Sequence, residues 1–364
     1  MLEKVTILRS DAIKKGVARA PHRALLYSTG VSKKNIDKPF IGIASSFTDI
    51  VPGHTGMREL ERQIEKGIQS AGGQAFIFGT PAVCDGLAMG HKGMRYSLPS
   101  RDLIADCVET MAEAHQLDGL VLLSNCDKIT PAMLIASVRL NIPTIIVTAG
   151  PMLAGECNCE KTSFIKSTFE AIGKFRNGEI DETQLSNLEE NACPTAGSCQ
   201  GLYTANTMAC LTEVLGMSLP ECATASAVSS LKKRIAFDSG YRAVELVKEQ
   251  LLPRDIITKE SLRNAILCDY ALGGSTNSFL HLLAIAHAGD IDLKLDDFEE
   301  LSSKIKQIVK LDPTALPNMT DFHNAGGISG LMRVISENID EFSNTLSITG
   351  EKIKNIIKNA QYKP

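Results

Sequence analysis

Four short segments in the first part of the chain are apolar at nearly every position. They cover residues 40–44, 75–78, 119–123 and 143–148, and they are rich in Ile, Val, Leu and Phe. A strand that is apolar on both faces is typical of a parallel sheet that helices cover on both sides. The pattern therefore predicts four buried, parallel strands.

Segments with helical spacing separate these strands. The predicted helices cover residues 58–70, 101–115 and 131–140. Ser100 is the predicted N-cap of the second helix, and Pro131 suits the first turn of the third. Strand alternating with helix at this spacing predicts an α/β fold with a doubly wound, mostly parallel sheet flanked by helices.

The rest of the chain has mostly helical patterns, so we expect a largely helical second half. The predicted helices cover residues 162–174, 181–191, 204–215, 223–252, 258–267 and 279–288, followed by a proline-interrupted helical region at 292–335. The last segment is rich in lysine and only weakly amphipathic. We interpret residues 1–350 as one domain and 351–364 as the start of an interdomain linker.

Composition narrows the class of protein. The chain has 364 residues, of which 44% are hydrophobic and 22% charged, and these values lie in the globular range. The formal net charge is −4 and no block of Lys or Arg occurs, which disfavours a nucleic-acid partner. No apolar stretch reaches the roughly 20 residues that span a membrane, and the N-terminus lacks the apolar core of a signal peptide. We therefore expect a cytoplasmic protein without a membrane partner.

The ten cysteines need an explanation other than disulfides, because cytoplasmic thiols stay reduced. The absence of any CxxC pair disfavours a zinc ribbon or a thioredoxin motif. Cys107 and Cys210 lie within helical patterns and are interpreted as core residues. Cys157 and Cys159 are assigned to a surface loop. Four histidines are interpreted as packing or capping residues: His22, His91, His281 and His287.

The string SNCDKITP directly follows the third predicted strand. It places Cys126, Asp127 and Lys128 at the carboxyl end of that strand, which is where ligands bind in open α/β sheets. Thiolates suit iron–sulfur clusters or zinc, whereas carboxylates suit magnesium. The combination predicts a site that holds two different metals side by side.

Other loops carry further candidate ligands. The loop at 45–54 follows the first strand, and the glycine-rich loop at 80–94, which contains Asp85, follows the second. Cys199 lies on a Gly/Ser turn before a predicted helix, where nearby backbone N–H groups favour a thiolate. It is interpreted as a cluster ligand or a nucleophile, with a free turn cysteine as the alternative. The turn at 273–277 either cradles a phosphate or connects two helices tightly.

Long and unusual strings occur along nearly the whole chain. They are APHRALLYSTG (20–30), DGLAMGHKGMRYSLPSRDLIADCVE (85–109), SNCDKITPAMLIASVRLNIP (124–143), CPTAGSCQGLYTANTM (193–208), GGSTNSFLHLLAIA (273–286) and AGGISGLM (325–332). In these strings the chain resembles the dihydroxyacid dehydratase family, which also includes phosphogluconate and sugar-acid dehydratases. The wording RLNIPTIIVTAGPM is closer to the branched-chain dihydroxyacid members.

The resemblance implies two cofactors. An iron–sulfur cluster is expected on Cys126 and Cys199, and a magnesium ion on Asp85 and Asp127. Lys128 is expected to be carbamylated and to bind the same magnesium, because a carbamate replaces a repelling ammonium with an anionic oxygen ligand. The alternative for Lys128 is a solvent-facing lysine at a helix entry.

The reaction implied by the resemblance is the dehydration of 2,3-dihydroxyisovalerate and 2,3-dihydroxy-3-methylvalerate to 2-oxo acids in valine and isoleucine biosynthesis. Magnesium would stabilise charge at the carboxylate and the C2 oxygen, and a cluster iron would act as a Lewis acid on the C3 hydroxyl. The alternatives are a sugar-acid or 6-phosphogluconate dehydratase and, in another class, an iron–sulfur-binding regulatory module. The chain lacks the GxGxxG and GxxxxGK[ST] motifs that a nucleotide-binding protein would need.

The chain departs from the family pattern in two respects. Many members carry a third cluster cysteine in a PCN motif after the first strand, where residues 52–54 of this chain read PGH. The third ligand is therefore open among His54, Cys84 and Cys193, with His54 favoured by its position.

The second departure is length, because family members carry an additional β-rich domain with a further metal-binding Glu, substrate contacts and a serine base. We interpret the chain as the N-terminal domain alone, with the C-terminal β-rich domain absent, and expect no turnover by it in isolation. In its full-length form the protein is expected to be a homodimer that acts on a small-molecule dihydroxy acid.

Overall fold

The computed structural model describes residues 7–157 and 160–363. Four parallel strands form its main sheet in the order β2-β1-β3-β4. They are β1 (Phe40–Ser45), β2 (Gln74–Gly79), β3 (Gly119–Ser124) and β4 (Thr144–Thr148). All four predicted strands are confirmed to within one residue at each end. In this register Ile43 of β1 is flanked by Ile77 of β2 and Val121 of β3.

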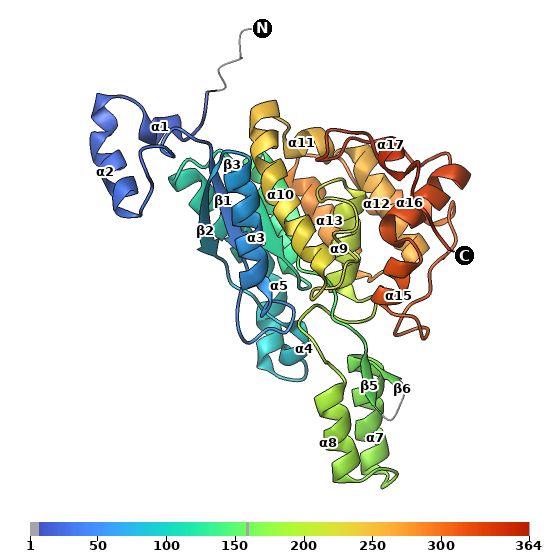
Figure 1. Ribbon diagram of the computed structural model, residues 1–364. Coiled ribbons are helices and arrows are strands. Elements are labelled where there is room, and N and C mark those ends of the chain that lie inside the picture. Colours follow the sequence, from blue (N-terminus) through green and yellow to red (C-terminus); the bar gives the residue numbers. More distant parts are fainter. Residues whose placement is uncertain (1–6, 158–159, 364) are drawn as a thin grey trace.

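Helices cover both faces of this sheet. The helices α3 (Met57–Ser70) and α10 (Ser230–Glu249) pack side by side on one face, which is the nearer one in Figure 1. The helices α5 (Ser97–Ala114) and α6 (Ile129–Leu140) pack against each other, and right-handed crossovers place them on the opposite face. This arrangement confirms the doubly wound α/β fold.

The winding of the sheet reverses between β1 and β3. The chain passes from β1 to β2 at one edge and then returns across β1 to β3, so β1 and β3 are neighbours. Ser45 and Ser124 end these two strands at the same edge of the sheet. The connections that follow leave in opposite directions, and such a reversal point is where open α/β sheets bind their ligands.

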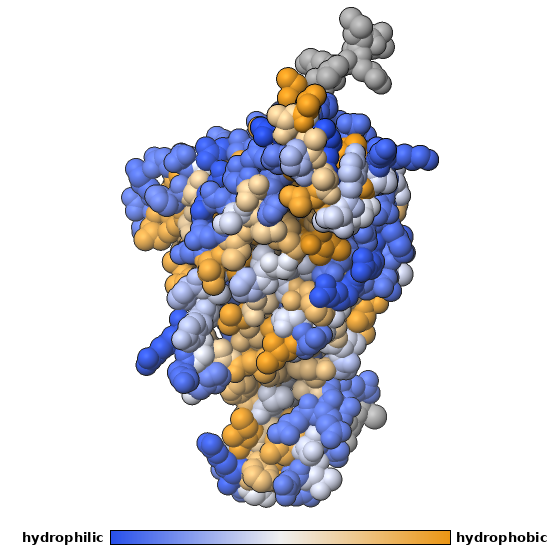
Figure 2. Space-filling view, turned by 90° about the vertical axis from the view of Figure 1, so that its left-hand side faces the viewer, coloured by the Kyte–Doolittle hydropathy of each residue, from blue (hydrophilic) through white to orange (hydrophobic). Residues whose placement is uncertain are grey.

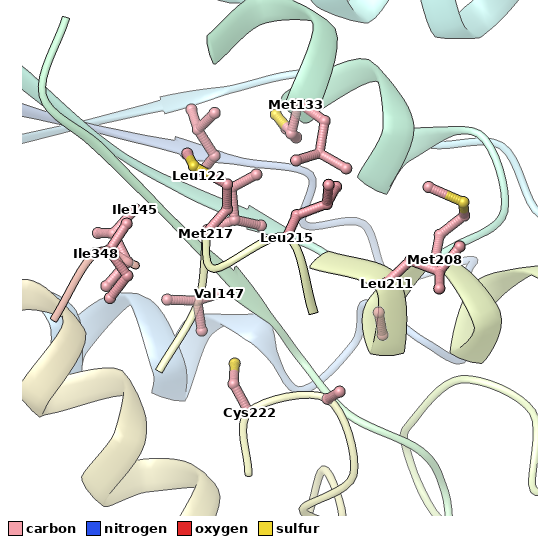
Figure 3. Close-up of a cluster of buried hydrophobic side chains, with 14 of the residues drawn as sticks. Leu122, Met133, Ile145, Val147, Met208, Leu211, Leu215, Met217, Cys222 and Ile348 are labelled. Atoms are coloured by element: carbon pink, nitrogen blue, oxygen red, sulfur yellow. The ribbon is translucent and has the colours of Figure 1, made fainter. Parts of the chain in front are cut away.

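The second half of the chain is largely helical, as predicted. Its helices are α7 (Phe169–Arg176), α8 (Glu182–Asn191), α9 (Thr204–Val214), α11 (Pro253–Ile256), α12 (Lys259–Leu272), α13 (Asn277–Ala288), α14 (Leu295–Ser302), α15 (Met319–Asn324), α16 (Gly327–Asn338) and α17 (Ile353–Ile357). Every residue of α9 is buried. Figure 3 shows Met208 and Leu211 of α9 in one cluster with Leu122 of β3 and Val147 of β4. One core therefore joins the helical half to the sheet.

Shorter elements extend from this body. They are α1 (Asp11–Lys14), η1 (Val17–Arg19), α2 (Ala20–Ser28), α4 (Asp85–Ala88), η2 (Lys92–Tyr96), the hairpin of β5 (Gly155–Cys157) and β6 (Glu160–Thr162), and the π-helix η3 (Phe164–Thr168). In Figure 1, α2 projects at one end of the molecule, and the hairpin projects with α7 and α8 at the other. Cys157 ends β5, whereas Cys159 lies outside the described residues.

Several predicted helix boundaries were wrong. The helix predicted from residue 101 begins at Ser97, so Ser100 lies in the first turn and donates to the Ser97 carbonyl at 2.6 Å instead of capping the helix. The helix predicted at 223–252 begins at Ser230, after the capping residue Ser229. The segment predicted at 162–174 is divided among β6, η3 and α7.

The predicted boundary at residue 350 stays a prediction. Beyond it, α17 packs against α16 and buries Ile353 and Ile357. The segment therefore adds apolar contacts to the body of the molecule.

The surface carries a number of large apolar side chains. Figure 2 views the molecule from the side of α2 and shows apolar residues interspersed with polar ones over that face. Exposed examples near the carboxyl edge of the sheet are Leu87, Met94, Tyr96 and Leu103. Among the described helices, none combines the length and the apolarity that crossing a membrane requires.

Glycines set the separation of α3 and α10. A Cβ atom on Gly67 of α3 would lie 2.0 Å from the carbonyl oxygen of Phe237, and one on Gly240 of α10 would lie 2.1 Å from that of Ile64. These neighbours are backbone atoms, which cannot rotate away. The two helices can therefore approach this closely only because neither glycine has a side chain.

We predict that Gly240→Ala lowers the free energy of unfolding by about 2 kcal/mol, because the added methyl group forces α3 and α10 apart. The matched control is Gly173→Ala in α7, where no heavy atom of the described residues lies within 4 Å of the added Cβ apart from the chain neighbours and the helix's own backbone. That change is expected to leave stability unchanged or to raise it by up to about 1 kcal/mol. Urea unfolding of both variants measures the difference, and equal effects would contradict this account of the helix crossing.

Candidate functional site

A buried asparagine connects the loops at the carboxyl edge of the sheet. Asn125 follows β3 directly, and its Nδ2 donates to the carbonyl oxygens of Gly53 at 2.9 Å and Gly150 at 3.0 Å. Its Oδ1 accepts from the backbone N–H of Gly150 at 3.1 Å. One side chain thus fixes the loops after β1, β3 and β4 to one another. The sequence analysis missed this role, although Asn125 stands beside Cys126.

The predicted magnesium ligands come together at this edge. The Nζ of Lys128 lies 3.2 Å from Oδ2 of Asp85 and 3.8 Å from Oδ2 of Asp127. Asp85 begins α4 after β2, whereas Asp127 and Lys128 follow β3, so two separate loops supply the group. Ser97 donates to Oδ1 of Asp85 at 2.7 Å, and Oδ1 of Asn277 accepts from Lys128 at 3.2 Å.

Electrostatics at this group favours a cation. Burial raises the pKa of Asp127, and the charge of Asp85 raises it further, while Lys128 and a hydrogen bond from Thr204 act in the opposite direction. Two carboxylates therefore share one ammonium in a largely buried place. A divalent cation would relieve their repulsion, and a carbamate on Lys128 would add a third anionic oxygen donor. The donor set fits the expected magnesium ion.

Three cysteines lie within electrostatic range of one another and of Asp127. Burial raises the pKa of Cys126 well above its usual range, and the charges of Cys84, Asp127 and Cys199 raise it further. Burial also raises the pKa of Cys199 to about 12, with contributions from Asp127 and Cys84. Ionisation of one thiol therefore disfavours ionisation of the others. Binding to iron would allow the thiols to lose their protons. This chemistry fits the expected iron–sulfur cluster.

The three candidates for the third cluster ligand differ in burial and in their surroundings. His54 is fully buried; its Nδ1 lies 2.7 Å from the carbonyl oxygen of Ser46, and burial lowers its pKa to about 4. The Nε2 of His54 has no hydrogen-bond partner among the described residues. Cys193 is exposed, whereas Cys84 is half-buried beside Cys126 and Cys199.

Within residues 7–157 and 160–363, no three His, Cys, Asp or Glu side chains form a ready-made ligand set for a single metal ion. The expected magnesium set contains two carboxylates and depends on Lys128 for its third donor. The cysteines of a cluster with several irons would not need to converge on one ion, so they can be spread more widely than the ligands of a single metal ion. Both expected sets therefore differ from a preformed single-ion site.

Arg101 and His281 also lie close to the Lys128 group. The Nη1 of Arg101 is 3.4 Å from Nδ1 of His281. Burial lowers the pKa of His281 to about 3, and the positive charges of Lys128 and Arg101 lower it further, so the imidazole is neutral. The packing or capping role predicted for His281 stays a prediction.

The turn at 273–277 connects α12 to α13 and positions Asn277. Gly273 ends α12 with a φ of 69°, in the left-handed region, and the hydroxyls of Ser275 and Thr204 are 2.8 Å apart. The backbone N–H of Ser275 donates to Thr207 at 3.1 Å. The turn is a tight connection between helices, and a phosphate site there stays a prediction. Asn277, Ser97 and Thr204 were missed, although each lies in a string quoted for the family resemblance.

The buried residue Asp269 accepts hydrogen bonds from this turn and from the start of α13. Ser278 donates to Oδ2 of Asp269 at 2.6 Å, and the backbone N–H of Gly274 donates to the Asp269 carbonyl at 3.0 Å. Burial raises the pKa of Asp269 to about 7. The start of α13, which carries Asn277, is therefore attached to a group that titrates near neutral pH.

Comparison with known proteins identifies the family of this chain. The sequence model of the "Dihydroxy-acid/6-phosphogluconate dehydratase N-terminal" family matches residues 38–356. The chain is 57% identical to a dihydroxy-acid dehydratase of Endomicrobium trichonymphae over 354 residues and 56% identical to one of Geotalea daltonii over 353, in each case 97% of this chain. A dihydroxy-acid dehydratase of Geobacter sulfurreducens is 59% identical over 327 residues, 90% of this chain. The matches span 64%, 64% and 59% of these three relatives.

We predict that Asp269→Asn flattens the dependence of stability on pH. The folded-state pKa of about 7 lies above the unfolded value of 3.8, so the folded protein binds more protons between these values. The unfolding free energy should therefore fall by on the order of 3 kcal/mol as pH rises from about 4 to 7, and this part of the loss should vanish in the variant.

The control is Asp106→Asn, which removes an exposed ion pair with Arg139. Glu213, whose pKa burial also raises to about 7, contributes equally to all three proteins and cancels in the comparison. Urea unfolding at several pH values measures the slopes. Identical slopes in the wild type and Asp269→Asn would show that Asp269 is ionised across this range.

Proposed function

The chain belongs to the dihydroxy-acid/6-phosphogluconate dehydratase family, and we propose that it provides the metal-binding part of a dihydroxy-acid dehydratase. This hydro-lyase removes water from 2,3-dihydroxyisovalerate and 2,3-dihydroxy-3-methylvalerate and forms the 2-oxo acids of valine and isoleucine biosynthesis. The observation that supports it most directly is the grouping of Asp85, Asp127 and Lys128 beside buried thiols.

In this proposal Asp85, Asp127 and carbamylated Lys128 hold magnesium, and Cys126 and Cys199 hold an iron–sulfur cluster. When bound, the two centres supply Lewis-acid charge at the substrate carboxylate and C2 oxygen and at the C3 hydroxyl. The soft and hard donors on adjacent loops match these two kinds of metal. The site can therefore keep the metals apart by ligand chemistry alone.

The protein's own groups prepare Lys128 for this role. Carbamylation joins the neutral Nζ to CO₂, releases one proton and leaves one N–H on the nitrogen. That N–H can still donate to Oδ1 of Asn277, which now accepts from Nζ at 3.2 Å. Ser97 holds the Asp85 carboxylate by a hydrogen bond of 2.7 Å and so limits its rotation. Asn277 and Ser97 act as positioning residues for the metal ligands.

The alternatives are less well supported. The named relatives are dihydroxy-acid dehydratases, which does not favour a sugar-acid or 6-phosphogluconate substrate. A regulatory iron–sulfur module would have no use for two carboxylates grouped around a buried lysine. The base that takes the C2 proton is predicted to lie in the additional domain, outside the part of the relatives that this chain matches, and this stays a prediction. We also propose that the full-length enzyme is a homodimer in the cytoplasm.

We predict that Asp127→Asn in the native full-length protein lowers the formation of 2-oxo acid from 2,3-dihydroxyisovalerate by about 100-fold or more, because a magnesium ligand is lost. Asp106→Asn serves as the surface control and should retain wild-type turnover. Hydrazone derivatisation of the 2-oxo acid measures the rate. Faster turnover of 6-phosphogluconate by the wild type would contradict the substrate assignment, and full activity of Asp127→Asn would contradict the magnesium site.

A further inference from the structure

The cluster proposed above lacks a ligand. Iron–sulfur clusters are held by several cysteine thiolates, and only Cys126 and Cys199 occupy positions that the family motifs assign. The two residues come from separate segments, after β3 and before α9. A cluster held by these two alone could pivot about the line that joins them. A third attachment is therefore needed from another direction.

The loop after β1 does not provide this attachment with a thiol. A Cβ atom on Gly53 would lie 3.1 Å from Sγ of Cys126 and 3.6 Å from the carbonyl oxygen of Gly197, so position 53 faces the space between the two cysteine-bearing segments. The backbone N–H of Gly197 donates to the carbonyl of Pro52 at 3.0 Å and holds the segments together there. A side chain at position 53 would reach a cluster, but glycine offers none.

The neighbouring loop after β2 brings a thiol to the same place. Cys84 immediately precedes Asp85, whose carboxylate is 3.2 Å from Nζ of Lys128, and Lys128 is only two positions beyond Cys126. This contact holds the loop that carries Cys84 next to the segment that carries Cys126. Cys84 therefore reaches the proposed cluster position from a third loop, separate from the segments that carry Cys126 and Cys199.

Apolar cover completes this corner. A Cβ atom on Gly86 would lie 3.6 Å from Sγ of Cys84 and 3.5 Å from the ring of Phe164. The backbone N–H of Phe164 donates to Oε1 of Gln200 at 3.0 Å, which ties the backbone of Phe164 to the residue that follows Cys199. An apolar ring in this position restricts the access of water to a cluster and so tunes and protects it.

We propose that Cys84 is the third thiolate of the iron–sulfur cluster and takes over the attachment that glycine leaves open at position 53. Each of the three thiols loses its proton to solvent as its sulfur bonds to iron. The inference rests on the proposed function only in requiring that this chain binds a cluster. It assigns the three attachments to the loops after β2 and β3 and to the turn before α9.

The test uses this chain purified and reconstituted without oxygen, with iron, acid-labile sulfide, visible absorbance and the EPR spectrum of the reduced cluster as readouts. Cys84→Ala is expected to lower bound iron and sulfide by at least about tenfold relative to the wild type. The matched control is Cys193→Ala, which removes an exposed thiol next to the same segment and should keep both at the wild-type level.

A second variant separates a lost ligand from a damaged fold. Gly53→Cys in the Cys84→Ala background should restore iron and sulfide with a changed EPR spectrum, because the new thiol points at Cys126. Its Cβ contacts of 3.1 and 3.2 Å require only that the Cys126 and Asn125 side chains shift slightly.

Retention of the full cluster by Cys84→Ala, with loss in Cys126→Ala, would overturn the role of Cys84 and leave the proposed function standing. Absence of iron and sulfide from the wild-type chain would overturn the premise that this chain binds a cluster, and with it the role of Cys84, and would leave the family assignment standing.

Discussion

The site depends on the adjacency of β1 and β3, which lie side by side where the winding direction of the sheet reverses. This adjacency brings the loops after two adjacent strands to one edge, and the buried amide of Asn125 then joins them to the loop after β4. Cys126, Asp127 and Lys128 have fixed positions only because this edge is fixed. The glycine contacts between α3 and α10 fix the helices on one face of the sheet, and the buried helix α9 shares the core with β3 and β4.

The chemistry of the edge follows from its crowding. The loops hold several acidic groups together in a largely buried place. Burial chiefly, and the charges of neighbouring groups in addition, raise the pKa values of Asp127, Cys126 and Cys199. Such an arrangement is unfavourable for the protein alone and becomes favourable when cations share it. Hard oxygen donors and soft sulfur donors both occur at this edge, which suits two different metals. The proposed metal cations would relieve this electrostatic repulsion.

The strands and the doubly wound topology could be predicted from the sequence, because apolar runs and helical spacing are local patterns, whereas the metal ligands drawn from the motif strings stay predictions. Sequence reasoning missed groups whose role depends on partners far away in the chain. Asn277 meets Lys128 across 149 positions, and nothing in the turn at 273–277 indicates that partner. It also misplaced the start of α5, since Ser100 resembles an N-cap but bonds back to Ser97 within the helix. The position of Cys84 beside Cys126 likewise depends on two loops that only the folded sheet brings together.

The central claim is that Asp85, Asp127 and Lys128 form one divalent-cation site, and Mn²⁺ binding measured by EPR tests it most directly. The wild-type chain should bind a stoichiometric amount of Mn²⁺ in place of magnesium, and more tightly when bicarbonate supplies CO₂ for Lys128. Binding should be lost in Asp85→Asn, and Lys128→Met should abolish the response to bicarbonate, while Asp106→Asn behaves as the wild type. Equal Mn²⁺ binding by all four proteins, with no effect of bicarbonate, would contradict the account.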